Sequence, residues 1–70
     1  MSIDFRPLLA RVEDTRNQSR EILGKWKQRR DCGGLAPAAH AEADRMVAAA
    51  ERNVAHMEEL AESLRRAVNQ

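Results

Sequence analysis

Two repeats of small and apolar residues, separated by a single break, constrain the fold of this chain more than any other feature. Along residues 5–26 and again along residues 43–68, such side chains recur at alternating intervals of three and four residues. This spacing places them on one face of an α-helix and is typical of helices that pack along a heptad seam. The predicted seams are Phe5, Leu8, Val12, Thr15, Ser19, Ile22 and Trp26 in the first run, and Ala43, Val47, Ala50, Val54, Met57, Ala61, Leu64 and Val68 in the second.

The break itself, RRDCGGLAP at residues 29–37, has the composition of a turn. Gly33 or Gly34 can adopt the left-handed conformation that ends a helix, and Pro37 fits the first turn of the next one. We therefore predict a single domain over residues 1–70, with one helix over about 4–31, a turn over about 32–36 and a second helix over about 37–68. Asp4 is the predicted N-cap. A connection this short makes the two helices antiparallel neighbours, so the predicted fold is an all-α helical hairpin.

A turn centred between Gly34 and Leu35 also predicts which residues face one another. In that register Trp26 packs against Ala43, so the largest seam side chain meets one of the smallest, as interdigitated packing requires. Arg16 is expected beside Glu51 and Glu58. The other predicted layers are Phe5 with Leu64, Leu8 with Ala61, Val12 with Met57, Thr15 with Val54, Ser19 with Ala50, and Ile22 with Val47.

A chain of 70 residues buries so little apolar surface that folding alone is marginal without disulfides, metal or association, and we expect association. One cysteine excludes an internal disulfide, and there is no paired-cysteine zinc motif. Further apolar residues widen the seams, and we expect those of the two helices on opposite flanks of the hairpin. One flank is expected to close a homodimeric four-helix bundle, and the other stays free for a different protein. The predicted partner-binding residues are Leu9, Leu23, Met46 and Leu60.

These features favour a non-enzymatic protein–protein interaction module, such as a small adaptor, chaperone or regulator. The alternative is a small nucleic-acid-binding regulator. The segment KWKQRR places four cations around an indole that can stack on a base. Its predicted nucleic-acid contacts are Lys25, Lys27, Arg29 and Arg30, although Trp26 falls on the seam and is better explained as a plug at the turn end of the core.

Chemistry at a site is not expected. Cys32 and His40 flank the turn, but a nucleophile and base need a third orienting group and a pocket that excludes water. His56 lies away from the seam and cannot join them, so we expect no catalytic or metal site, no cofactor and no small-molecule substrate.

No run of 18 apolar residues and no signal-like start occur, which favours a cytoplasmic protein without a membrane partner. Arginine supplies ten of the twelve basic residues, which is typical of bacterial or phage genomes rich in G and C.

Overall fold

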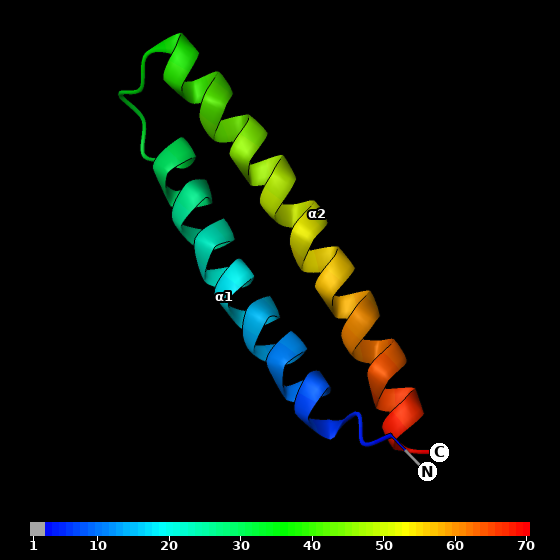
Figure 1. The fold of residues 1–70 in the computed structure, drawn as a ribbon. Coiled ribbons are helices and arrows are strands. Elements are labelled where there is room, and N and C mark those ends of the chain that lie inside the picture. The colour runs from blue at the N-terminus through cyan, green and yellow to red at the C-terminus, as the bar shows by residue number, and fades with distance from the viewer. Residues whose placement is uncertain (1–2) are drawn as a thin grey trace.

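The computed structural model describes residues 3–70, which form two antiparallel helices joined by one turn. Helix α1 spans Arg6–Asp31 and helix α2 spans Pro37–Val68. The helices lie side by side, with the start of α1 and the end of α2 at the end of the rod away from the turn (Figure 1). The molecule measures 57 × 14 × 14 Å. The predicted all-α hairpin is therefore confirmed.

The turn uses both of its glycines. Gly33 has φ +79° and Gly34 has φ +77°, a backbone region that is open to glycine and strained for other residues. The prediction had assigned the left-handed conformation to one of the two. With both in that region, the connection rises past the end of α1 before α2 begins at Pro37, so the first turn of α2 extends beyond α1 (Figure 1).

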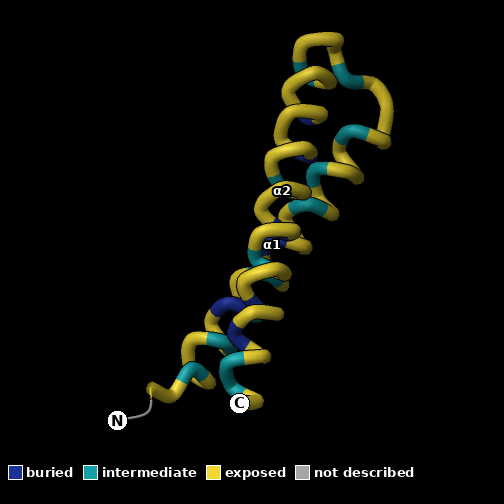
Figure 2. Tube along the Cα trace, turned by 90° about the vertical axis from the view of Figure 1, so that its right-hand side faces the viewer, coloured by how far each residue is buried: buried dark blue, intermediate teal, exposed yellow. Residues whose placement is uncertain are grey.

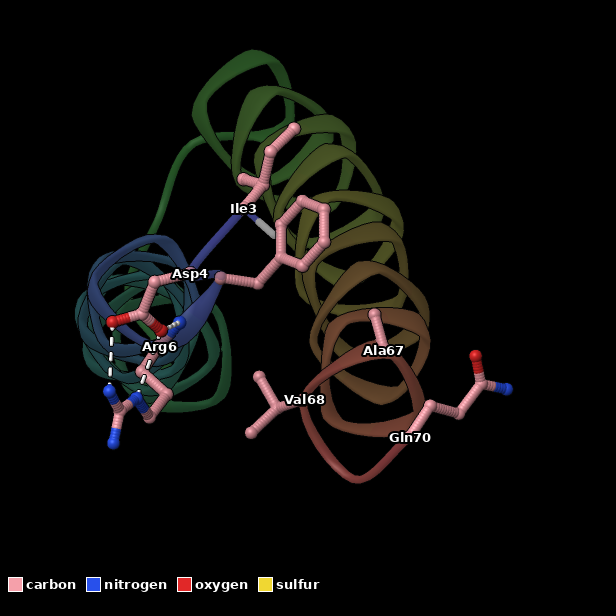
Figure 3. Close-up of a pocket in the computed structure, with 7 residues that line it drawn as sticks. Ile3, Asp4, Arg6, Ala67, Val68 and Gln70 are labelled. Atoms are coloured by element: carbon pink, nitrogen blue, oxygen red, sulfur yellow. Dashed lines mark hydrogen bonds and ion pairs between the residues drawn. The ribbon is translucent and has the colours of Figure 1, made fainter. Parts of the chain in front are cut away.

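Asp4 is not the N-cap residue of α1, as predicted, but lies one position before it. Helix α1 begins at Arg6, and the N-cap position is Phe5, which makes no side-chain cap. The Asp4 carboxylate instead accepts the backbone N–H of Arg6 at 3.0 Å and pairs with the Arg6 guanidinium at 2.9 Å. The side-chain hydrogen bond from Arg6, supported by that backbone N–H, lowers the pKa of Asp4 below its usual value. Figure 3 shows this pair on the outer side of α1, whereas Val68 points into the space between the helices.

The seam of α2 follows the prediction. Its predicted residues are all buried or half-buried, and Figure 2 shows buried and half-buried segments recurring along the rod. The buried ones are Ala43, Val47, Val54, Ala61 and Leu64, and the half-buried ones are Ala50, Met57 and Val68.

The seam of α1 differs from the prediction at alternate positions. Leu8 is 48% exposed and Ile22 is 51% exposed, so the assignment of both to the seam is wrong. Thr15 is also exposed, and its hydroxyl donates to the Arg11 carbonyl of its own helix. The residues that face inward form the line Phe5, Leu9, Val12, Arg16, Ser19, Leu23, Trp26 and Arg30, each buried or half-buried.

Because the inward-facing residues of α1 differ from the prediction, their partners on α2 differ as well. Ser19 accepts a hydrogen bond from the Asn53 amide at 3.0 Å, and Arg30 lies 3.8 Å from Asp44. The predicted register had placed Ser19 against Ala50, so the observed pairing is displaced by about one helical turn. Arg16 likewise bonds to Asn17 and not to the glutamates of α2. The predicted facing pairs that contain Leu8, Thr15 and Ile22 are therefore wrong, because these three side chains are exposed. Phe5 and Met57, by contrast, pack against the cluster that contains their predicted partners, Leu64 and Val12.

The core of the hairpin is thin. Its one cluster within the described chain joins Val12, Ala61 and Leu64, with Phe5, Leu9 and Met57 packed around it. These residues lie in the half of the hairpin near the chain ends. No large side chain of residues 3–70 is fully buried. Each helix therefore buries one line of residues against the other, and the sides of both helices remain exposed.

Candidate interaction surface

One flank of the hairpin carries the exposed large apolar residues of both helices. We call Leu8, Ile22, Met46 and Leu60 the apolar flank; their exposed fractions range from 39% to 51%. Ile22 and Met46 border the same shallow hollow between the helices, together with Trp26 and Asn53. Leu8 lies fourteen residues before Ile22, and Leu60 fourteen residues after Met46, which is close to four helical turns in each case. All four side chains therefore project on the same side.

The opposite flank is charged. Arg20 forms an ion pair with Glu58, and Arg65 bonds Glu13 at 3.1 Å, both between α1 and α2. Arg20 and Ile22 are two residues apart, which is about 200° around a helix, so they lie on opposite sides of the line that contacts α2. Each exposed pair contributes only about 0.2 to 1 kcal/mol. Together they favour the observed register and keep this flank in water.

The arrangement changes two of the four predicted partner-binding residues. Met46 and Leu60 are exposed as expected, and they belong to the apolar flank. Leu9 packs against the core cluster, and Leu23 is half-buried on the side that faces α2. Leu8 and Ile22 take their place outside. The prediction of two apolar extensions on opposite flanks is therefore wrong, since the exposed residues of both helices share one flank.

At the middle of the hairpin a polar contact interrupts the seam. Ser19 is 6% exposed, and its hydroxyl oxygen accepts a hydrogen bond from the Asn53 amide. Asn53 is itself exposed and borders the hollow beside Ile22 and Met46. The apolar flank thus has two apolar ends with a polar centre between them.

The basic end of α1 is partly engaged inside the chain. The Arg29 guanidinium lies 5.7 Å from the centroid of the Trp26 ring. Arg30 pairs with Asp31 at 3.0 Å, and this hydrogen bond lowers the pKa of Asp31 below its usual value. Lys25 and Lys27 are exposed. Trp26 is half-buried at the edge of the hollow, so its ring is only partly open for stacking on a base.

The residues weighed for chemistry are Cys32, His40 and His56. Cys32 is an exposed free thiol, and the His40 imidazole lies 3.3 Å from Asp44. His56 is exposed on α2. Within residues 3–70, no three histidine, cysteine or acidic side chains come together as metal ligands would. Neither α1 nor α2 contains an apolar stretch long enough to cross a membrane.

Comparison with known proteins adds no relative to this description. The chain matches no family model, no curated protein and no solved structure.

Proposed function

We propose that this chain is a non-enzymatic protein interaction module that pairs with a second copy of itself through the apolar flank, completing a four-helix bundle. The observation that carries the proposal is the gathering of Leu8, Ile22, Met46 and Leu60 on one flank, while cross-helix ion pairs occupy the other. Isolated apolar residues on a surface are ordinary, but exposed large apolar residues of two helices gathered on one side favour a contact surface.

The surface area of the hairpin supports a partner of this size. The chain exposes 5430 Å². A compact monomer of 7.9 kDa exposes about 4,400 Å², so the excess is about 1,000 Å². A stable interface covers about 800 Å² on each partner. A second hairpin laid along the apolar flank offers an equally long apolar surface, and its contact would bury an exposed area of similar size.

Charge is the second support for self-association. Burying the charged flank would require breaking or dehydrating the Arg20–Glu58 and Glu13–Arg65 pairs, which costs more than it returns. The apolar flank carries no such cost, since its centre holds only the neutral Thr15 and Asn53. Two copies therefore meet through this flank and keep their charged flanks outside. A dimer of this kind would act as an adaptor or regulator that presents its outer helix faces to other proteins.

The alternative, a nucleic-acid-binding regulator using Lys25, Lys27, Arg29 and Arg30, is the weaker proposal. Arg30 is neutralised by Asp31 and Asp44, and Arg29 lies over Trp26. A salt titration separates the two functions. Association through apolar area changes little between low and moderate salt, whereas phosphate binding falls steeply.

Sedimentation equilibrium over a concentration series tests the proposal. We expect the unaltered chain to form a dimer, and Leu60→Asp to shift it toward the monomer while keeping its helical circular dichroism. Glu59→Ala is the matched control, because Glu59 is an exposed neighbour of Leu60 that does not belong to the apolar flank, and it should leave the dimer unchanged. A monomer at every concentration, or a dimer unaffected by Leu60→Asp, would refute the proposal.

A further inference from the structure

The middle of the apolar flank is polar on both helices. Midway between the two apolar residues of the flank on each helix stands one polar residue, Thr15 on α1 and Asn53 on α2. Ser19 bonds Asn53 and lies about one helical turn after Thr15, so the polar residues of both helices lie at similar heights along the rod. Gln18 is exposed beside them, four residues before Ile22 on the same side of α1. A partner that covers both apolar ends of the flank therefore also covers Asn53.

Asn53 keeps hydrogen-bonding capacity that the hairpin does not use. Among residues 3–70 its side chain makes one hydrogen bond, from the amide nitrogen to the Ser19 hydroxyl at 3.0 Å. An asparagine amide has two N–H donors and a carbonyl oxygen, so one N–H and the carbonyl remain open. Asn53 is exposed and borders the hollow beside Ile22 and Met46, so water reaches these groups in the single hairpin. A partner seated on the flank displaces that water.

The chemistry of the partner then decides the outcome for Asn53. A wholly apolar helix face offers no group in place of the displaced water, and the amide of Asn53 is left unpaired inside the contact. A polar group left unpaired in this way lowers affinity by roughly tenfold to a hundredfold. A partner with donors and acceptors at the same height avoids this loss.

A second copy of the chain carries such groups. Its Gln18 and Asn53 each have donors and an acceptor. The Thr15 hydroxyl donates to the Arg11 carbonyl of its own helix, and its oxygen can still accept a hydrogen bond. Because these residues lie midway along the flank, they remain midway when the second copy is turned end for end. The match therefore requires no particular direction of the second copy.

From this pattern, and resting on the proposed function, we infer that Asn53 is the specificity-determining residue of the apolar flank. It weakens association, and it restricts the flank to a partner with hydrogen-bonding groups at mid-height, which a second copy has. A single polar residue in an apolar seam sets the register and the number of chains of coiled coils in the same way, at a cost in stability. Leucine at this position would join Met46 and Leu60 into one apolar line and remove the restriction.

The variant Asn53→Leu tests this role by sedimentation equilibrium over a concentration series. We expect the unaltered chain to form a dimer as its single associated species. The variant should associate at least tenfold more tightly and form species larger than a dimer. Since the substitution also leaves the Ser19 hydroxyl without its amide donor, the double variant Ser19→Ala with Asn53→Leu is measured beside it and should behave alike. Helical circular dichroism checks that each chain is folded.

Ser19→Ala alone is the matched control, because it removes the bond between the helices and keeps the amide of Asn53 on the flank. We expect this control to form a dimer only, with no gain in affinity. Unchanged or weaker association of Asn53→Leu, or a dimer as its largest species, would overturn the role of Asn53. The same gain in Ser19→Ala would overturn it as well, since a loosened hairpin would then be the cause. A monomer at every concentration of the unaltered chain would instead overturn the proposed function itself.

Discussion

Truncating Leu9 should destabilise the hairpin far more than truncating its neighbour Leu8. Leu9 packs against the cluster of Val12, Ala61 and Leu64. Leu8 belongs to the apolar flank and is 48% exposed. Replacing a buried leucine by alanine costs about 2 to 5 kcal/mol in protein cores. Because Leu9 is half-buried, we expect the low end, about 2 kcal/mol for Leu9→Ala, and about 0.5 kcal/mol for Leu8→Ala.

The comparison is made by thermal and urea unfolding, followed by helical circular dichroism. In a domain of this size about 2 kcal/mol lowers the melting temperature by roughly 10 °C, and about 0.5 kcal/mol by only a few degrees. The protein is kept at the lowest usable concentration, since a dimer adds stability by mass action and would penalise the loss of Leu8 as well. Equal losses at the two positions, or a larger loss for Leu8→Ala, would refute the face of α1 described above.

Two further changes test the turn and the cap. Gly34→Ala should destabilise the hairpin by about 1 kcal/mol because Gly34 has φ +77°, whereas Gly24→Ala, inside exposed α1 with open space around the new methyl group, should stabilise it by about 0.5 to 1 kcal/mol; urea midpoints of the two variants check both signs, and a stabilising Gly34→Ala would contradict the turn conformation. Asp4→Asn removes the ion pair with Arg6. Since the pKa of Asp4 is lowered in the fold, the stability it adds is present above the usual aspartate pKa and is lost as pH falls through the lowered value. Urea unfolding of both chains across the acid range should show the difference at neutral pH and none in strong acid, and a difference that persists in strong acid would exclude the ion pair as its source.

The sequence predicts α2 better than α1 for a physical reason. Along α2 one line of small and apolar residues is unbroken, whereas the neighbouring line through Met46 and Leu60 is interrupted by the polar Asn53, so the seam is easier to assign. Along α1 two apolar residues stand next to each other at both critical places, Leu8 with Leu9 and Ile22 with Leu23. Either member of each pair satisfies a heptad spacing. Which member of each pair faces inward depends on how the other helix packs against it. The spacing of apolar residues along one helix does not determine this.

The register escapes prediction for a related reason. A connection of a few residues restricts two helices to being neighbours, but it fixes their relative height only if its shape is known. Two consecutive left-handed glycines give this turn enough rise to lift the start of α2 beyond the end of α1. At mid-height Ser19 accordingly bonds to Asn53, three residues beyond its predicted partner Ala50. The two predicted partner-binding residues that are exposed, Met46 and Leu60, come from the helix whose seam follows the prediction.

The contact between Ser19 and Asn53 has a consequence for how firmly the two helices hold their positions. A seam built largely from alanine and valine offers similar grooves at each turn, so one helix could slip along the other with little loss of apolar contact. Such a slip would leave the enclosed Ser19 hydroxyl opposite the methyl group of Ala50, without its amide donor, at a cost of about 1 kcal/mol or more. One small hydroxyl therefore resists sliding from inside the contact, where the two exposed ion pairs between the helices resist it only weakly.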